Sequence, residues 1–337
     1  MRARRACGPG AHDDHVVPAH RSIMSVSHIP GVNGLTPRMD TAVSVERRTA
    51  TAHATLLAVV VVWAGAFSVI KALLDHGFVA EDIAILRYLV AAPGFAYLLW
   101  RVGGLPGLTR RDALRLGAVG FCVVVGYHVF LNVGTKYTTS GTAALVIALS
   151  PALTLLLATG LGLERWNLRR ALGLAVAFAG VAIVVLLGAG GDLSFANAKG
   201  PLIVLVAPIA FALYNVLLKP LLGRYDLLAL TAATSLVGTV FLLPFVGGGT
   251  VDAVTGISGE DALLVLYLGV ASTFLGYIGW NIGLRGLGAT RAVAYTYLIS
   301  PLAVLIGAMI LDEPVTLWLV VGGALVLGGV AAAQRAR

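Results

Sequence analysis

The long apolar segments of this chain carry a small set of polar and aromatic side chains that could bind a ligand. The set combines one arginine, one histidine, three asparagine amides and seven aromatic rings. A small-molecule site is mostly apolar, with a few polar groups that fix the orientation of the ligand. We therefore expect these residues to line such a site. They are Trp63, Phe67, Arg87, Tyr127, His128, Asn132, Tyr214, Asn215, Tyr277, Trp280, Asn281 and Tyr295.

Arg87 is the most informative of these residues, because a charge inside an apolar segment is costly and usually faces a partner or a cavity. The chain places no Asp or Glu in the middle of any apolar segment. Two interpretations stay open. Arg87 could bind the carboxylate or phosphate of a substrate, or its side chain could extend outward to Glu81, Asp82 or a lipid phosphate.

Catalytic and metal-binding patterns are absent from the sequence. It contains no GxxxxGK[ST] phosphate loop, no HExxH and no GxSxG. Cys7 and Cys122 are too far apart for a metal-binding motif. We expect no enzyme, cofactor or metal. His128 is the one ordinary candidate for proton coupling, but a buried, hydrogen-bonded histidine is the simpler interpretation. Uncoupled transport and counter-transport are equally open.

The composition predicts an all-α membrane protein. Hydrophobic residues make up 58% of the 337 residues, charged residues make up 12%, and the mean hydropathy is +0.90. An apolar helix of about 20 residues crosses a bilayer, and helices satisfy their own backbone hydrogen bonds there. The ten apolar runs are 54–74, 80–100, 114–134, 140–163, 168–188, 201–219, 227–247, 262–283, 289–311 and 315–333.

Lys and Arg are distributed unevenly between alternate loops, and this predicts the orientation. The chain has a net charge of +8, and its cations cluster in the N-terminal segment, in every second loop and at the C-terminus. The other loops carry only Lys136 and Lys199. Because positive loops stay in the cytoplasm, we expect both termini there, in the plasma or inner membrane. This placement also explains the basic charge without nucleic acid.

Residues 1–50 differ from the rest, with many arginines and histidines and no long apolar run. They predict a disordered cytoplasmic tail. A translation start at Met39 is the alternative.

The two halves of the apolar region resemble each other, as expected for an internal repeat. Ser150-Pro151 matches Ser300-Pro301, and Asn132 with Gly134 matches Asn281 with Gly283, at a nearly constant spacing of about 150 residues. Five helices per half is an odd number, so the second half would enter the membrane from the opposite side. We expect two inverted five-helix repeats, residues 54–188 and 201–333.

Pro151 and Pro301 fall near the centres of the fourth and ninth apolar runs. Proline removes a helix hydrogen bond, so matched breaks at this depth suit hinges or gates; a simple packing kink is the alternative. Glycines in the fifth and tenth runs, such as Gly173 and Gly328, allow close helix contact. That contact could lie within the chain or in a homodimer.

Several short motifs together resemble the EamA family of the drug/metabolite transporter superfamily. They are Trp63-Ala64-Gly65-Ala66-Phe67 with Lys71, Leu86-Arg87-Tyr88, Ser150-Pro151 followed by Leu163-Glu164, and Ser300-Pro301 with Asp312-Glu313-Pro314. The resemblance covers about residues 54–333. It departs from the family at the apolar Ala152 and Leu302 after each proline, and the second half has no counterpart of Arg87.

The resemblance implies a secondary transporter with ten membrane helices that moves a small metabolite or drug by alternating access, typically as an exporter. Its partners would be the small-molecule substrate and the lipid bilayer. A membrane sensor or a channel without carrier activity is the alternative.

Overall fold

The computed structural model describes residues 36–163, 167–187 and 195–335. The compact unit that carries the apolar segments runs from Glu46 to Arg337, and a separate N-terminal unit ends at Val45. Helix α1 (Thr36–Asp75) begins inside the stretch predicted as a tail. Residues 1–35 and Glu164 lie outside the described residues.

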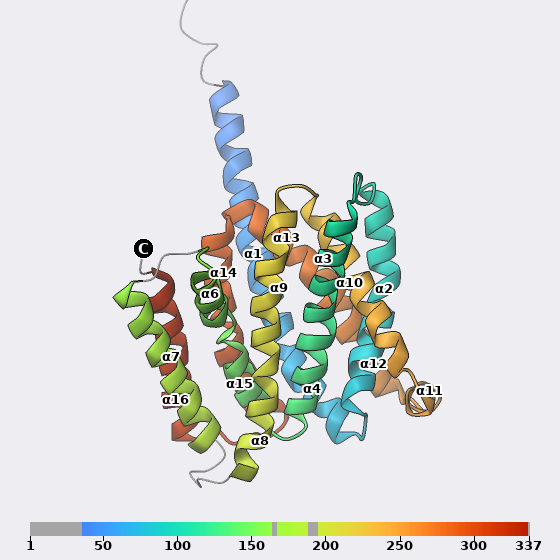
Figure 1. The fold of residues 1–337 in the computed structure, drawn as a ribbon, viewed down its shortest axis with the longest axis vertical. Coiled ribbons are helices and arrows are strands. Elements are labelled where there is room, and N and C mark those ends of the chain that lie inside the picture. The colour runs from blue at the N-terminus through green and yellow to red at the C-terminus, as the bar shows by residue number, and fades with distance from the viewer. Residues whose placement is uncertain (1–35, 164–166, 188–194, 336–337) are drawn as a thin grey trace, which may run out of the picture. The chain divides into compact units, whose positions relative to one another are not determined.

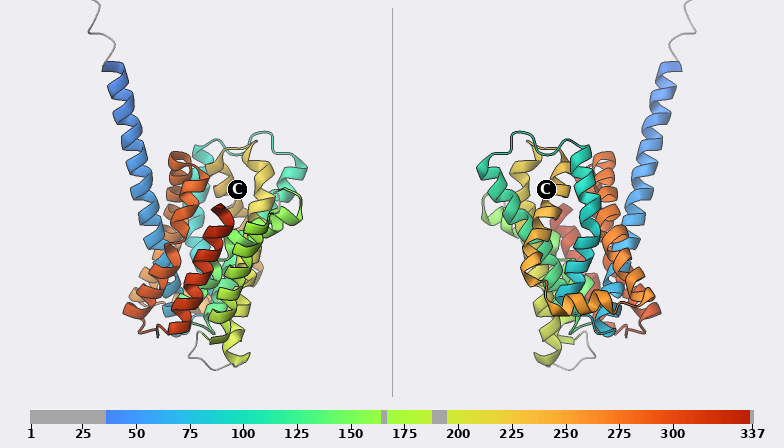
Figure 2. Two further views of the ribbon diagram at one scale, coloured as in Figure 1. Left: turned by 90° about the vertical axis from the view of Figure 1, so that its left-hand side faces the viewer. Right: turned by 90° about the vertical axis from the view of Figure 1, so that its right-hand side faces the viewer.

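All regular elements of the described residues are helical (Figures 1 and 2). After α1 they are α2 (Ala80–Arg101), α3 (Arg110–Gly120), the π-helical η1 (Phe121–Val129), α4 (Phe130–Thr135), α5 (Ser140–Ile147), α6 (Ser150–Gly160), α7 (Leu168–Leu187), α8 (Phe195–Val204), α9 (Val206–Leu222), α10 (Leu227–Leu242), the short η2 (Leu243–Phe245), α11 (Gly248–Thr255), α12 (Gly259–Leu266), the π-helical η3 (Tyr267–Leu275), α13 (Gly276–Leu287), α14 (Ala289–Thr296), α15 (Ile299–Ile310) and α16 (Leu317–Arg335).

These elements join into ten stretches long and apolar enough to cross a membrane. The prediction of an all-α membrane protein with ten spanning helices is confirmed. The fourth predicted run, 140–163, corresponds to the stretch Ser140–Gly160, and the tenth, 315–333, corresponds to Leu317–Arg335. Hydropathy located the spans because apolar length is the property that a bilayer requires.

Both prolines predicted to break helices lie directly after an interruption. Pro151 is the second residue of α6, after Ala148 and Leu149 separate it from α5. Proline cannot donate to the carbonyl four residues earlier. That carbonyl, on Ile147, instead accepts a hydrogen bond of 2.6 Å from the Ser150 hydroxyl. Pro301 is likewise the third residue of α15, after the break that ends α14.

Helices α7 and α16 form the closest helix pair, and they lie side by side in Figure 1. A Cβ atom on Gly173 would lie 2.5 Å from the backbone nitrogen of Ala333, and one on Gly180 would lie 2.6 Å from that of Val326. Only glycine permits backbones to approach this closely. These glycines therefore serve packing within the chain.

We expect Gly173→Ala to lower the free energy of unfolding by about 1–3 kcal/mol, because its methyl group would overlap the backbone of α16. The matched control is Gly328→Ala, at a position where an added Cβ meets nothing within 4 Å. Both substitutions raise helix propensity equally. The difference between their Tm values in detergent therefore measures the effect of the steric overlap alone. Equal Tm values for the two variants would contradict this account of the packing.

Candidate functional site

Arg87, on α2, is buried, and its partners are hydroxyl groups on a helix far away in the sequence. Its Nε donates to Thr273 Oγ1, and its Nη2 donates to Ser272 Oγ at 3.0 Å. Only 5% of Arg87 is exposed. The described residues give this guanidinium no carboxylate partner. The charge is thus hydrogen-bonded but not neutralised.

The structure does not pair Arg87 with the nearby acids that an outward-extended side chain would meet. Asp82, five residues earlier on α2, is itself buried and accepts a hydrogen bond from the Thr250 hydroxyl of α11. Arg87 instead turns toward η3 and pairs with neither Glu81 nor Asp82.

The π-helical segment η3 explains how Ser272 and Thr273 hold Arg87. The Thr273 hydroxyl donates to the Leu268 carbonyl five residues earlier, at 2.8 Å, which leaves its oxygen lone pairs to accept from Arg87. The Ser272 carbonyl accepts from the Trp63 indole of α1 at 2.9 Å. Such π-helical turns are often found at functional sites. Here η3, in the second half of the chain, accepts hydrogen bonds from Trp63 of α1 and Arg87 of α2.

Aromatic side chains extend from this point in a connected cluster. Trp63 packs against Tyr277 and Trp280 of α13, with ring centroids 6.1 and 5.6 Å apart. Tyr88, the neighbour of Arg87, has its hydroxyl 3.5 Å from that of Tyr277 and 3.0 Å from His128 Nδ1. The structure therefore brings Trp63, Tyr277 and Trp280 together with the residues beside Arg87.

The cluster continues on the other side of His128. Tyr127, on η1, packs against Phe211 of α9 with centroids 5.6 Å apart, and Phe211 stacks on Tyr214 at 5.3 Å. The cluster thus takes side chains from α1, α2, η1, α9 and α13. Tyr88, Ser272 and Thr273 were absent from the predicted set. Adjacent hydroxyl residues inside an apolar helix were the signal that could have identified the last two.

His128 is held by hydrogen bonds that explain its burial. Its Nδ1 lies 2.8 Å from the Val123 carbonyl as well as 3.0 Å from the Tyr88 hydroxyl. A carbonyl oxygen can only accept, so Nδ1 carries the proton. The Tyr88 hydroxyl then accepts from His128 and can donate toward Tyr277. This arrangement fits the simpler interpretation of a structural histidine.

The remaining predicted residues lie outside this cluster or serve helix packing. Asn132 Nδ2 donates to the Ala80 carbonyl at the start of α2, at 3.1 Å. Asn281 Nδ2 donates to the Thr231 hydroxyl near the start of α10, also at 3.1 Å.

The two asparagines therefore contact different helices, and Asn281 also donates to the Tyr277 carbonyl of its own helix at 2.8 Å. Asn215 donates to the Phe211 carbonyl of its own helix at 2.9 Å. Tyr295 bonds His53, and Phe67 packs in the apolar core.

A second polar contact joins the ends of two interrupted helices. Glu313, which follows α15, accepts hydrogen bonds from the Ser140 backbone at 2.7 Å, the Ser140 hydroxyl at 2.8 Å and the Gly141 backbone at 3.3 Å. A carboxylate at a helix N-terminus meets unpaired N–H groups and the positive end of the helix dipole. We call Glu313, Ser140 and Gly141 the clamp. Through these bonds Glu313 caps the N-terminus of α5.

The backbone around the clamp is shaped to fit it. Asp312 has a φ of 52°, in the left-handed region that non-glycine residues rarely adopt. A Cβ on Gly307 would lie 2.5 Å from both Glu313 Oε2 and the Ser140 hydroxyl, so a larger residue would displace the carboxylate.

Comparison with known proteins gives consistent matches. The sequence profile of the EamA-like transporter family matches residues 50–186 and again 198–333. An uncharacterized transporter of Archaeoglobus fulgidus is 34% identical over 76% of this chain and 88% of its own. A probable terminal-alkyne amino-acid exporter of Streptantibioticus cattleyicolor is 32% identical over 82% of this chain and 90% of its own.

A solved protein structure resembles this fold with a TM-score of 0.53 at 22% identity, covering 85% of this chain and 95% of the other. At this identity the similarity concerns the fold alone. The two relatives named above carry the names of a transporter and an exporter, which agrees with the ten spanning helices.

We expect Glu313→Gln to lower the free energy of unfolding by about 1.5–3 kcal/mol, because a neutral amide replaces a charged acceptor of three hydrogen bonds. Ser140→Ala, which removes only the hydroxyl contact, should cost less. The control is Asp252→Asn, which neutralises an exposed carboxylate. A Tm for Glu313→Gln equal to that of the control would show that the clamp adds no stability.

Proposed function

Because the chain belongs to the EamA-like transporter family, we propose that it is a secondary transporter that exports a small carboxylate-bearing metabolite by alternating access. The single observation behind the substrate class is the buried guanidinium of Arg87, which the described residues hydrogen-bond but do not neutralise. A substrate carboxylate would supply the missing charge and a bidentate acceptor.

The neighbouring rings support the same substrate class. Trp63, Tyr277 and Trp280 offer apolar faces close to the Ser272-Thr273 pair that holds Arg87. The cluster contains no Asp or Glu that would bind an amine or a cationic drug. A compound with a carboxylate and an apolar side chain, such as an organic acid, therefore fits this chemistry best. The relative from Streptantibioticus cattleyicolor carries the name of a probable amino-acid exporter.

Matched features in the two halves support alternating access between inverted repeats, 54–188 and 201–333. The fourth and ninth spans are each interrupted just before a Ser-Pro pair, and the third and eighth each contain a π-helical segment. Segments α5 and α15 pack together through the clamp and through Ser300, whose hydroxyl donates to the Ala144 carbonyl at 2.8 Å. Segment α6 packs against α9.

The fourth span therefore contacts the ninth span at its α5 end and the sixth span at its α6 end. A carrier that is closed on one side of the membrane requires such a difference. The bias of Lys and Arg supports a cytoplasmic position for both termini in a plasma or inner membrane, and the clamp would then lie on the outer side. Pro151 and Pro301 would act as hinges, because each follows a break that removes helix hydrogen bonds.

The deciding experiment is counterflow into proteoliposomes, with labelled neutral amino acids, organic acids, nucleosides and cationic drugs as separate substrates. Saturable uptake of one carboxylate-bearing class, accelerated by the same compound inside, supports the carrier. Non-saturating flux would establish a channel, and binding without flux would establish a sensor.

We expect Arg87→Gln to reduce the flux of a carboxylate substrate about tenfold to a hundredfold, because a charge-assisted hydrogen bond contributes about 1.5–3 kcal/mol. Transport of the uncharged amide of the same compound should change little. The matched control is Lys71→Gln, which removes a cation from α1 that pairs with Asp75 at 2.8 Å. Equal losses for the acid and its amide would assign Arg87 a structural role and refute the carboxylate site.

A further inference from the structure

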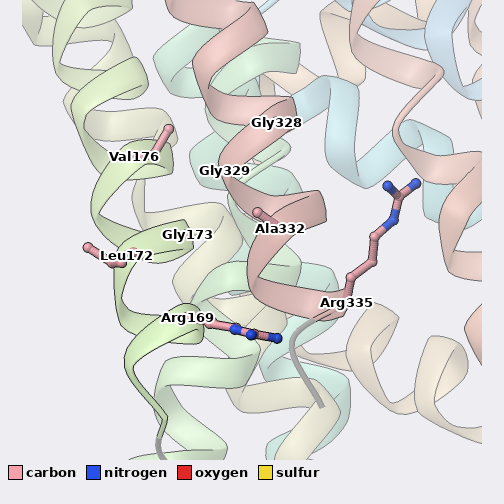
Figure 3. Close-up of a pocket in the computed structure, with 8 residues that line it drawn as sticks. All are labelled: Arg169, Leu172, Gly173, Val176, Gly328, Gly329, Ala332 and Arg335. Atoms are coloured by element: carbon pink, nitrogen blue, oxygen red, sulfur yellow. The ribbon is translucent and has the colours of Figure 1, made fainter.

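An open groove of about 460 Å³ runs between the end of α16 and the start of α7, away from the aromatic cluster (Figure 3). Its walls are apolar or small, formed by Leu172, Val176, Gly328 and Ala332. Leu172 is 58% exposed and Val176 is 42% exposed. Both belong to a membrane-spanning helix, so their exposed faces meet lipid rather than water.

Two arginines stand at the mouth of this groove, Arg169 on α7 and Arg335 on α16. Neither has a carboxylate partner among the described residues, and both are exposed. In Figure 3 the Arg169 guanidinium reaches toward the end of α16, whereas the Arg335 side chain rises from that end and turns away from α7. Arg169 is therefore placed for direct contact with an anion at the mouth.

Gly328 leaves open space in the groove, because it has no side chain. An added Cβ at this position would meet nothing within 4 Å. The other two glycines that line the groove, Gly173 and Gly329, contact the opposite backbone instead. Gly328 is thus the glycine of this region that packing between the two helices does not explain.

We propose that this groove binds an anionic phospholipid, with an acyl chain along Leu172, Val176 and Gly328 and the headgroup phosphate at Arg169. A phospholipid matches both parts at once, because the walls need an apolar occupant and the mouth needs a negative charge. Basic pockets between membrane helices on the cytoplasmic side are suited to such headgroups. The charge bias of the loops places Arg169 and Arg335 on that side.

Charge complementarity favours a lipid over a second copy of this chain. A twofold symmetric dimer brings the same patch of both copies together. Arg169 and Arg335 of one copy would then face the same unneutralised arginines of the other. A phosphodiester relieves this charge, whereas a second copy doubles it.

Native mass spectrometry of the detergent-purified full chain tests the proposal, with titrated phosphatidylglycerol and phosphatidylcholine of identical acyl chains. We expect preferential retention of phosphatidylglycerol. Arg169→Gln should weaken this binding about fivefold, the effect of one cation near an anionic lipid. Arg335→Gln should have a smaller effect, because its guanidinium points away from the groove.

Gly328→Leu is the second arm, because its side chain would occupy the groove while both arginines are kept. It should reduce phosphatidylglycerol binding while the Tm of the lipid-free protein stays unchanged. The control is Arg285→Gln, which removes an arginine that pairs with Asp226 at 2.8 Å outside the groove. That variant should bind phosphatidylglycerol as the unmodified protein does.

Three results would overturn the assignment. Equal retention of both lipids would remove the role of charge. Undiminished binding in Gly328→Leu would place the lipid elsewhere on the surface. Competition by soluble glycerol phosphate at the same concentration as the lipid would show a phosphate site that needs no acyl chain.

Discussion

The need to satisfy every backbone polar group inside a bilayer governs this structure. Most of each span meets it with regular helix, but the spans also contain breaks, and at two of these breaks a side chain supplies a hydrogen bond. The Ser150 hydroxyl bonds the carbonyl that Pro151 cannot, and Thr273 bonds the Leu268 carbonyl within the π-helical η3. The Trp63 indole bonds the Ser272 carbonyl from another helix. Irregular backbone survives where such donors are available, and the polar groups of the candidate site gather at the same places.

The position of Arg87 follows from this constraint. A regular helix uses its carbonyl and N–H groups internally, so it offers a buried cation only side chains as partners. The widened turn of η3 presents two neighbouring hydroxyls toward α2, and Arg87 donates to both. Hydroxyl groups lower the cost of burying the guanidinium without cancelling its charge. A carboxylate partner would have cancelled the charge and made the site inert toward an anionic ligand.

Sequence reasoning located the spans, the two proline breaks and most members of the aromatic cluster, because hydropathy and proline act locally. It could not locate the partners of Arg87, since residues 87 and 272 meet only through the packing of different halves of the chain. The π-helical turns escaped prediction for a similar reason, as no residue type marks them. The repeat matches Asn132 with Asn281, but the sequence does not show which groups their amides contact. Each amide bonds near the start of the preceding span, at Ala80 in one case and at Thr231 in the other.

The two Ser-Pro pairs, in the fourth and ninth spans, have the same sequence but make different hydrogen bonds. The Ser150 hydroxyl bonds within its own span, from α6 to Ile147 of α5, whereas the Ser300 hydroxyl donates to the Ala144 carbonyl of α5 in another span. The second contact ties the fourth span to the ninth, and the clamp at Glu313 ties the same two spans again. Together these bonds stabilise the arrangement in which the fourth and ninth spans are joined at α5 and α15. In the proposed carrier, reversal would break them, so the opposite arrangement must gain interactions of similar strength or draw on substrate binding. The proposed binding of a substrate carboxylate at Arg87 would be one means by which substrate binding favours one arrangement over the other.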